Sequence, residues 1–499
     1  MLLTGFLSIF TLKIMFLIIA GTVLGIIFGA IPGITVTMGV ALFLPITFGM
    51  DALEAICLLL ALYIGGTSGG LISAILLKIP GTPASIATTF DGHPLAMRGE
   101  AGKALGVGIV YSFIGGMLSV FVLMLLAPSL ADIALEFGPY EYFGLAFFSL
   151  TMIAGMSGKS IVRGGISAIL GIIFAFVGMA PITGFPRFTM GFDELSDGFS
   201  LLPALIGLFA VSQILEEVSR NKVEEEATAF NYNIKGFGFS WREFKGQTVN
   251  CLISTAIGTG IGILPGLGGG ICNLVAYGAV QKVSKYPEKF GTGVIDGIVA
   301  SETSNNASTG GAMIPLLTLG IPGDNTTAMI LAGFMIHGIT PGPLLFDTNG
   351  PIVYGVFAAL IVSNIVMLVS EFWCMRLFVR ILSVPKNLLL PIVGVMCIIG
   401  AYGVNNRVFD IWTMLGFGVL GFVMKRLAIP LAPIILGFIL CPILETNLRR
   451  GLQKSGGSLA PFFTEPISCM FIVVTLLVVA GMIYGEVKRR RKAALAASS

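Results

Sequence analysis

A run of uncharged, oxygen-bearing side chains interrupts a strongly apolar part of the chain, and a matching, shorter run occurs nearer the N-terminus. Hydroxyl, amide and backbone carbonyl oxygens hold hard cations such as Na⁺ well. We therefore expect a cation site here, although small polar residues also serve to pack helices together in membranes. The candidate ligands are Thr67, Ser68, Ser304, Asn305, Asn306, Ser308 and Thr309.

Pro-Gly pairs stand at four places, residues 32–33, 80–81, 265–266 and 322–323. Each pair is expected to interrupt a helix, which frees polar groups that lipid cannot satisfy. The N-termini of helices that restart there present N–H groups with partial positive charge, which suits a carboxylate. A tight turn or a plain kink is the structural alternative. The candidate substrate-binding residues are Gly33, Pro80, Gly81, Thr82, Gly266, Pro322, Gly323, Asp324, Asn325 and Thr326.

A few further polar residues near these breaks have residue types that allow more than one role. Thr82 and Asp324 stand where the next helix is expected to start, so capping is their alternative role. Glu302, beside the oxygen-rich run, is an ion ligand or a proton carrier if it lies inside the membrane. For His93 and His337 we favour structural roles, because each lies near a Gly-Pro turn.

The elements that must position these residues are membrane helices. Of the 499 residues 55% are hydrophobic and only 11% are charged, and mean hydropathy is +0.95. Apolar runs near the roughly 20 residues needed to cross a bilayer recur from residue 12 to residue 485, including 249–275 and 326–346. Such runs do not alternate as barrel strands do. The sequence therefore predicts an all-α polytopic membrane protein.

Composition also excludes several classes. The net charge of +3 is scattered over the ends of the apolar runs, so no nucleic-acid surface is expected. The seven cysteines lack C-x-x-C spacing, so neither a disulfide framework, a metal site nor a bound cofactor is indicated. The first apolar run is expected to be a retained helix rather than a signal peptide.

An internal repeat divides the chain. FGMDALEAICLLLALYIGGTSGGLISAILLKIPG, residues 48–81, aligns without a gap on FGTGVIDGIVASETSNNASTGGAMIPLLTLGIPG, residues 290–323. Upstream, GTVLGIIFGAIPGI resembles GTGIGILPGLGGGI, with Pro32 matching Pro265. Many transporters are built from two related halves. We expect a first half over 1–216, a linker over 217–247, a second half over 248–446, and a final transmembrane helix with a basic tail over 447–499.

Basic residues in short loops indicate which way each half faces, since cytoplasmic loops carry the excess of Lys and Arg. The basic tail at 488–492 is expected on the cytoplasmic side, and so is the 217–247 linker. Counting back from the tail, the span that begins near Ala104 starts on the cytoplasmic side and the span that begins near Pro351 starts on the opposite side. The loop at 448–466 is an exception, because it carries basic residues although it is assigned to the outside. The two halves therefore read as an inverted repeat with broken or re-entrant helices; a duplication in one orientation is the alternative.

The glycine-proline blocks resemble those of a known family. GTVLGIIFGAIPGI, YIGGTSGG, LLKIPGTPASIATTFDGHPLAMRGEAGKALG and SNNASTGGAMIPLLTLGIPGDNTTAMILAGFMIHGITPGPLLF are similar to the large membrane (permease) subunit of the tripartite tricarboxylate transporters, over nearly the whole chain. The resemblance implies a secondary permease of the bacterial inner membrane that works with a small membrane subunit and a periplasmic solute-binding protein. It would import di- or tricarboxylates, citrate-like organic anions, using an ion gradient.

Further properties follow from this resemblance only as expectations. The coupling ion is expected to be Na⁺, with H⁺ as the alternative. Similarity to other carboxylate transporters implies elevator-type motion, with rocking as the alternative, and a homodimer remains open.

Two other functions fit parts of the sequence. A passive anion channel is one, because half-helices that point into the membrane also build selectivity filters. A rhomboid-like serine protease is the other, with Ser68 as nucleophile and His337 or His93 as base. Its G-x-S-G motif is only four residues long, and the second repeat has Gly310 at the serine position. We therefore expect a transporter and no enzyme.

Overall fold

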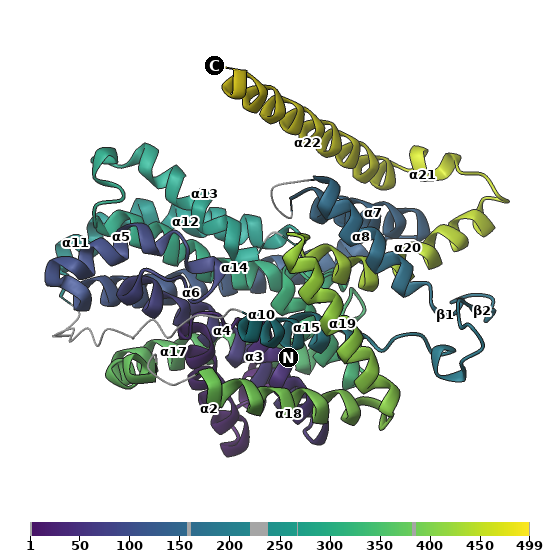
Figure 1. The fold of residues 1–499 in the computed structure, drawn as a ribbon, viewed down its shortest axis with the longest axis horizontal. Helices are drawn as coiled ribbons and strands as arrows, with labels where there is room; N and C mark the ends of the chain where they lie inside the picture. Colours follow the sequence, from purple (N-terminus) through teal and green to yellow (C-terminus); the bar gives the residue numbers. More distant parts are fainter. Residues whose placement is uncertain (1, 157–160, 220–237, 267, 382–385, 499) are drawn as a thin grey trace. The chain divides into compact units, whose positions relative to one another are not determined.

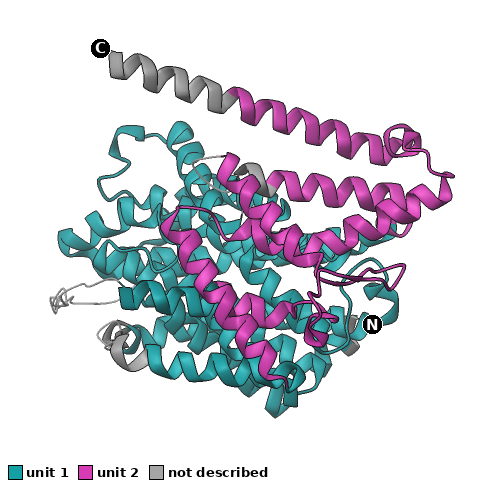
Figure 2. Cartoon of the chain, turned by 45° about the vertical axis from the view of Figure 1, so that its right-hand side comes forward, with its two compact units in different colours: residues 1–132, 209–406 teal, residues 133–208, 407–499 magenta. Residues whose placement is uncertain are grey.

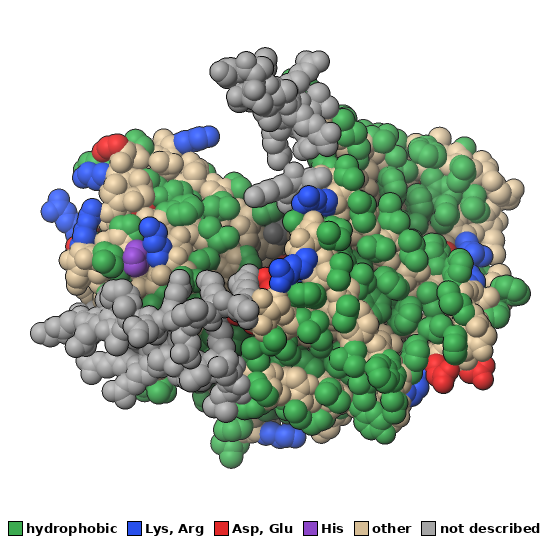
Figure 3. Space-filling model, in the orientation of Figure 1, with side chains coloured by type: hydrophobic (Ala, Val, Ile, Leu, Met, Phe, Trp, Pro, Cys, Tyr) green, Lys and Arg blue, Asp and Glu red, His purple; other side chains and the backbone are tan. Residues whose placement is uncertain are grey.

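The computed structural model describes the chain except for residues 1, 157–160, 220–237, 267, 382–385 and 499 (Figure 1). Over that part the elements are nearly all helices, with one short antiparallel pair of strands. Eight helical segments among the described residues are long and apolar enough to cross a membrane. Hydrophobic side chains dominate the face drawn in Figure 3, as contact with lipid requires. The prediction of an all-α polytopic membrane protein is confirmed.

The chain forms two compact units, shown in Figure 2. Unit 1 comprises 1–132 and 209–406, and unit 2 comprises 133–208 and 407–499. Each unit therefore takes segments from both of the expected halves. The division of the chain into two repeat halves concerns ancestry and orientation rather than compactness, and it stays a prediction.

Unit 1 contains every candidate site residue. Its central helices are α4 and α14, which are buried along almost their whole length. The elements are α1 (Leu2–Ser8), α2 (Leu12–Ala30), α3 (Val36–Phe43), η1 (Leu44–Gly49), α4 (Ala52–Leu77), η2 (Pro83–Ser85), α5 (Thr88–Leu95), η3 (Ala96–Glu100), α6 (Ala101–Leu135, up to residue 132), α10 (Ser212–Ser219), α11 (Trp241–Gly246), α12 (Thr248–Ile263), α13 (Gly268–Val283), η6 (Pro287–Lys289), α14 (Ile295–Leu319), α15 (Asn325–Ile336), α16 (Leu345–Thr348), α17 (Gly350–Ile381) and α18 (Lys386–Asn405).

Unit 2 is a smaller set of helices with the short strand pair between two of them. Gly178 pairs with Arg187, whose guanidinium lies 2.8 Å from the Glu445 carboxylate. The elements are α7 (Pro139–Met156), α8 (Ile161–Ala175), β1 (Gly178–Met179), β2 (Pro186–Arg187), η4 (Asp193–Leu195), α9 (Leu201–Ile206), α19 (Val408–Arg426), α20 (Ala432–Lys454), α21 (Ala460–Thr464) and α22 (Pro466–Ser498). The π-helical turn η5 (Gly207–Val211) spans the boundary with unit 1.

All four Pro-Gly pairs interrupt helices, as predicted. They fall between α2 and α3, between α4 and η2, between α12 and α13, and between α14 and α15. Gly33 and Gly266 have φ angles of 89° and 79°, a left-handed conformation that favours glycine. Lys78 and Gly320, which correspond in the repeat alignment, both end their helices in the left-handed region.

Three local expectations were wrong. The apolar run 249–275 is not one span, because the Pro265 break divides it into α12 and α13. The run 326–346 is helical only to Ile336, and the 12 residues of α15 extend about 18 Å, too short to cross a bilayer. Thr82 does not start an α-helix: it precedes the 3₁₀ turn η2, and α5 begins at Thr88.

Corresponding glycines bring corresponding helices into backbone contact. A Cβ on Gly29 of α2 would lie 2.1 Å from the Gly66 carbonyl oxygen of α4, and one on Gly262 of α12 would lie 2.6 Å from the Ser308 carbonyl oxygen of α14. Gly29 and Gly262 each precede the matched prolines by three residues, and Gly66 aligns with Ser308. The two halves therefore build the same helix contact from the same positions.

The described end of the 217–247 linker is tied to α6. Lys103 Nζ lies 2.7 Å from Glu243 Oε1 in α11, and the Tyr111 hydroxyl donates to the Phe244 carbonyl oxygen at 3.0 Å. Residues 220–237 of the linker lie outside the described residues. The Lys103 hydrogen bond, helped by the Ser240 backbone N–H, holds the pKa of Glu243 below its ordinary value of 4.5.

This ion pair predicts a pH dependence of stability. Because the folded-state pKa of Glu243 is lowered, its contribution is full above pH 4.5 and is lost as the pH falls through the lowered pKa. The pair is partly solvent-exposed, so we expect less than about 1 kcal/mol. Thermal unfolding of wild type and Glu243→Gln in detergent should differ slightly at neutral pH and converge in acid. A difference that persists undiminished in acid would contradict the assignment.

Candidate functional site

The helices that restart after the breaks begin close to one another. The Thr37 hydroxyl in the first turn of α3 lies 2.8 Å from the Thr326 hydroxyl in the first turn of α15. The Gly266 N–H, in the break before α13, donates to the Gly323 carbonyl oxygen in the break before α15 at 2.7 Å. Breaks from both halves of the chain thus meet within unit 1.

The N-terminal turn of α13 lies between two further segments that follow breaks. A Cβ on Gly268 would lie 3.0 Å from Asp324 Cβ, and one on Gly269 would lie 2.9 Å from Ala84 Cβ in η2. The Asn273 amide N–H donates to the Ala84 carbonyl oxygen. Glycine is therefore needed where α13 starts, because a larger residue would collide with its neighbours. The 80–81, 265–266 and 322–323 breaks converge at this turn.

Asp324 is the N-cap of α15, which is the structural role that the sequence allowed beside substrate binding. One carboxylate oxygen accepts the Thr327 backbone N–H at 2.7 Å, and the other accepts the Tyr63 hydroxyl at 2.7 Å. Thr327 Oγ1 in turn accepts the Asp324 N–H, completing a capping box. The Asp324 carboxylate thus occupies the N-terminal turn of α15. Asn325 is half-buried beside it.

The two breaks of the first half differ in their surroundings. The Gly33 carbonyl oxygen accepts the Gln213 amide N–H at 2.8 Å, and Thr35 Oγ1 caps α3 by accepting the Met38 N–H at 3.2 Å. Gly81 is packed so closely that a Cβ would lie 2.1 Å from the Gly29 carbonyl oxygen. Of the other candidates, Pro80 is half-buried, and Thr82, Pro322 and Gly323 are buried.

The oxygen-rich run lies inside α14 and is almost completely buried. Its hydroxyls donate within their own helix: Ser308 to the Asn305 carbonyl oxygen at 2.6 Å, and Thr309 to that of Asn306 at 2.7 Å. Ser304 likewise donates to the Ala300 carbonyl oxygen at 2.7 Å. Such bonding leaves the lone pairs of each hydroxyl oxygen able to accept, which suits either a cation or helix packing.

Two amide side chains in this run are half satisfied. Asn305 donates to the Thr67 carbonyl oxygen at 3.2 Å, and Asn306 donates to the Glu302 carbonyl oxygen at 3.1 Å. The Oδ1 atom of each is buried and accepts no hydrogen bond. A buried acceptor without a donor is costly unless a water or a cation meets it. These two oxygens are the strongest structural feature of the candidate cation site.

Ser68 differs from the other candidate cation ligands. Its hydroxyl donates to Glu371 Oε2 of α17 at 2.9 Å, and the Glu371 side chain is completely buried. Our sequence reasoning missed Glu371. The signal was available, because Glu371 is a carboxylate within the apolar run 351–376, and carboxylates inside the membrane are functional by default.

Both histidines have hydrogen-bond partners other than Ser68. His93 Nδ1 lies 3.1 Å from the Ile75 carbonyl oxygen, and His337 Nε2 lies 3.3 Å from Thr47 Oγ1. Since Ser68 donates to a carboxylate instead of a histidine, the arrangement lacks the serine-histidine contact of a protease.

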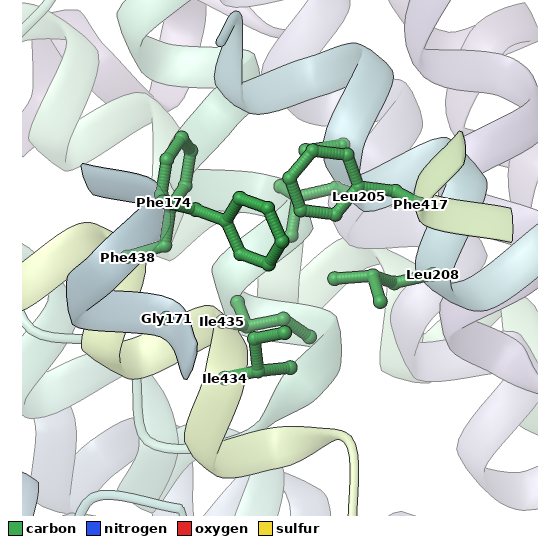
Figure 4. A pocket seen from close by; sticks show the side chains of 9 residues that line it. Gly171, Phe174, Leu205, Leu208, Phe417, Ile434, Ile435 and Phe438 are labelled. Carbon is green, nitrogen blue, oxygen red and sulfur yellow. The ribbon is translucent and has the colours of Figure 1, made fainter. Parts of the chain in front are cut away.

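Unit 2 holds an apolar pocket that includes no candidate site residue. Figure 4 shows aromatic and aliphatic side chains around it, without a polar group to orient a carboxylate. Its lining consists of Gly171, Phe174, Ala204, Leu205, Leu208, Phe417, Ile434, Ile435 and Phe438.

A polytopic helical fold with converging broken helices and buried, half-satisfied oxygens is typical of a membrane transporter of small ions. Residues 15–436 match the model of the tripartite tricarboxylate transporter TctA family, and the chain belongs to this family. It is thus similar to the large membrane components of tripartite systems, which work with a small membrane subunit and a periplasmic binding protein.

Two curated relatives come from Agrobacterium vitis. One, an uncharacterised 52.8 kDa protein in the TAR-I ttuC′ 3′ region, is 33% identical over 471 residues, which cover 94% of this chain and 93% of the relative. The other, an uncharacterised protein in the TAR-II ttuC′ 3′ region, is 34% identical over 234 residues, 47% of this chain and 97% of the relative. No solved structure matches the chain.

Proposed function

We propose that this protein imports di- or tricarboxylates across the bacterial inner membrane by secondary-active transport coupled to a cation gradient. It acts as the permease subunit beside a small membrane subunit and a periplasmic solute-binding protein, with its C-terminus in the cytoplasm. Family membership supports the class of transporter and its kind of partners. The substrate, the coupling ion and the mechanism rest on the geometry of unit 1.

The convergence of helix N-termini carries this proposal. The first turn of α13 lies where three of the breaks meet, the first turn of α3 contacts that of α15, and α13 begins on Gly268, Gly269 and Gly270. Glycines let a ligand approach backbone N–H groups closely, and helix N-termini attract anions. A substrate carboxylate therefore binds at the α13 turn, with Thr82 and Thr326 in the segments beside it.

A Na⁺ ion binds at the neighbouring oxygens. Asn305 Oδ1 and Ser308 Oγ lie beside Gly269. A Cβ added to Gly269 would be 2.9 Å from Asn305 Oδ1 and 3.2 Å from Ser308 Oγ. The cation site and the α13 turn are thus adjacent. Binding the cation first lowers the electrostatic cost of bringing in an anion, which couples the two ligands.

The matching glycine contacts of α2 with α4 and of α12 with α14 support a duplicated architecture. Together with the distribution of basic residues, they favour two halves of opposite orientation around the site. Alternating access by such halves then carries carboxylate and cation across together.

Replacing Asn305 by alanine tests this function. The change removes Oδ1, so Na⁺-driven uptake of labelled citrate or a dicarboxylate should fall at least tenfold. A tenfold fall corresponds to on the order of 1.4 kcal/mol of cation-binding free energy. Uptake is measured in proteoliposomes that contain the chain, its small membrane partner and the binding protein, with and without a Na⁺ gradient. Asn349→Ala, which removes an amide bonded only to Thr348 at the surface, is the control.

The comparison of uptake with and without the Na⁺ gradient distinguishes coupled transport from passive conduction. Accumulation above equilibrium only with the gradient supports coupled import. Equilibration of wild type regardless of the gradient would indicate a channel instead, and full Na⁺-driven uptake by Asn305→Ala would remove the cation role of the α14 run.

A further inference from the structure

Two arginines share one carboxylate oxygen in unit 2, in a part of the chain that the proposed function does not use. Arg187 Nη1 donates to Glu445 Oε1 at 2.8 Å, and Arg449 Nη2 lies 2.9 Å from the same oxygen. The side chains of Arg187 and Glu445 are 18% and 9% exposed, whereas that of Arg449 is 41% exposed. These three residues form the arginine cluster, in which two positive charges and one negative charge leave a net charge of +1.

The strand pair and an aromatic ring hold Arg187 in place. Arg187 lies opposite Gly178 in the antiparallel register of β1 and β2. Its guanidinium carbon lies 5.1 Å from the centre of the Phe176 ring, which is a cation–π contact. Arg187 Nε is buried and has no hydrogen-bond partner among the described residues. A buried donor without an acceptor is costly unless a water or an anion meets it.

The arginine cluster lies near the end of a helix that is long enough to cross a membrane. The 23 residues of α20 extend about 34 Å, slightly more than the roughly 30 Å of hydrocarbon, so its end reaches the lipid headgroups. Arg449 precedes the last residue, Lys454, by five positions, about 7.5 Å along the helix. Long basic side chains near helix ends extend toward the interface. We therefore expect the cluster at the depth of the lipid phosphates.

Large apolar side chains surround the cluster in sequence and remain exposed. Phe185 and Phe188, on either side of Arg187, are 68% and 66% exposed, and Met190 is 82% exposed. The helix α8, which leads into the strand pair, exposes an apolar stripe with helical spacing that comprises Val162, Ile166, Ile169 and Ile173. Apolar surface of this kind is stable against acyl chains. The positive charge is thus combined with a surface suited to lipid.

Charge balance distinguishes the anions that this cluster could hold. A phosphodiester carries one negative charge, which matches the cluster, whereas a di- or tricarboxylate brings two or three. Guanidinium groups bind phosphate oxygens through several N–H donors at once. A headgroup with its own ammonium would be repelled by the partly exposed Arg449. We propose that Arg187 and Arg449 bind the phosphate of an anionic phospholipid, whose acyl chains lie against Phe185, Phe188 and Met190.

This lipid site is separate from the carboxylate and cation sites of unit 1, so it does not depend on the proposed transport function. A bound phosphate joins β2 to α20 through the two arginines. It also gives Arg449 a role within the 448–466 loop, whose basic residues are the exception to the expected distribution of charge. An arginine that holds a lipid phosphate is useful on either face of the membrane.

Native mass spectrometry of the permease with its small membrane subunit tests the site. The complex is purified in detergent, stripped of lipid and titrated with phosphatidylglycerol or phosphatidylcholine. Wild type should prefer phosphatidylglycerol, and Arg449→Gln should bind it about fivefold more weakly, as expected for the loss of one arginine near a lipid surface. This variant keeps the buried Arg187–Glu445 pair neutral. The control is Arg450→Gln, which alters the exposed neighbouring arginine and should bind like wild type.

Equal affinity of wild type and Arg449→Gln for phosphatidylglycerol, or equal affinity of wild type for the two lipids, would overturn the proposal. Phe188→Asn keeps the test decisive if Arg449→Gln fails to fold, because asparagine tolerates the positive φ of 53° at this position. It should weaken binding several-fold, and unchanged binding would also overturn the proposal. Excess citrate should leave the lipid bound; displacement of the lipid by citrate would show that the cluster is a carboxylate site instead.

Discussion

Replacing Asp91 by alanine should destabilise unit 1 by about 3 kcal/mol or more. The Asp91 carboxylate in α5 is completely buried, and one of its oxygens accepts the backbone N–H groups of Gly291, Gly293 and Val294 at 3.0, 2.7 and 3.0 Å. The other accepts the Tyr277 hydroxyl at 2.7 Å. Alanine leaves these donors facing an apolar cavity, and the loop that leads into α14 loses its attachment.

The matched control is Asp91→Asn, which keeps the shape and one acceptor oxygen and should cost less than half as much. Both variants are compared with wild type by thermal unfolding in detergent and by the fraction that elutes as a single species in size-exclusion chromatography. Equal stability of Asp91→Ala and wild type would show that the loop at 291–294 is held by other contacts.

Substitution of the contact glycines should have a similarly large effect. In Gly29→Ala and Gly262→Ala the new methyl group would press on a backbone oxygen, at 2.1 Å and 2.6 Å, and backbone cannot rotate aside as a side chain can. Overpacking of this kind costs about 1–3 kcal/mol, and more where backbone must shift. We expect the Gly29 variant to be the more affected, because its contact is shorter.

Gly278→Ala provides the control for these variants. Gly278 is a helical glycine in α13 with no atom within 4 Å of an added Cβ, so alanine there should be neutral or stabilising by up to about 1 kcal/mol. The measurement is the unfolding temperature of the three variants in the same detergent, which should fall for Gly29→Ala and Gly262→Ala but not for Gly278→Ala. If Gly29→Ala and Gly278→Ala unfold together at the wild-type temperature, the close approach of α2 to α4 is wrong.

The sequence was most informative where backbone chemistry decides the structure. Proline and glycine restrict or release the main chain locally, so each of the four Pro-Gly pairs predicted a helix interruption that the structure contains. Asp324 was recognised as an N-cap for the same reason, since the capping bond joins residues three apart.

Contacts between distant segments could not be read in this way. Asp91 meets the loop before α14, and Ser68 meets Glu371, only because several helices pack together. The polar run of α14 was placed near a break, but its residues lie in the body of a buried helix and bond to their own backbone. Local propensity carries no information about which face of a buried helix meets which partner.

The interleaved boundaries of the two units have a mechanical consequence. The chain passes between the units three times, near residues 132, 208 and 406. Pro128 stands inside α6 just before the first passage, the π-helical turn Gly207–Val211 contains the second, and Asn406, at φ 52°, marks the third. Each is a place where a helix has lost its regular hydrogen bonding or ended. If the proposed transport displaces one unit as a rigid body, these three places are where the chain would bend, and the candidate site would keep its geometry because all of its residues belong to unit 1.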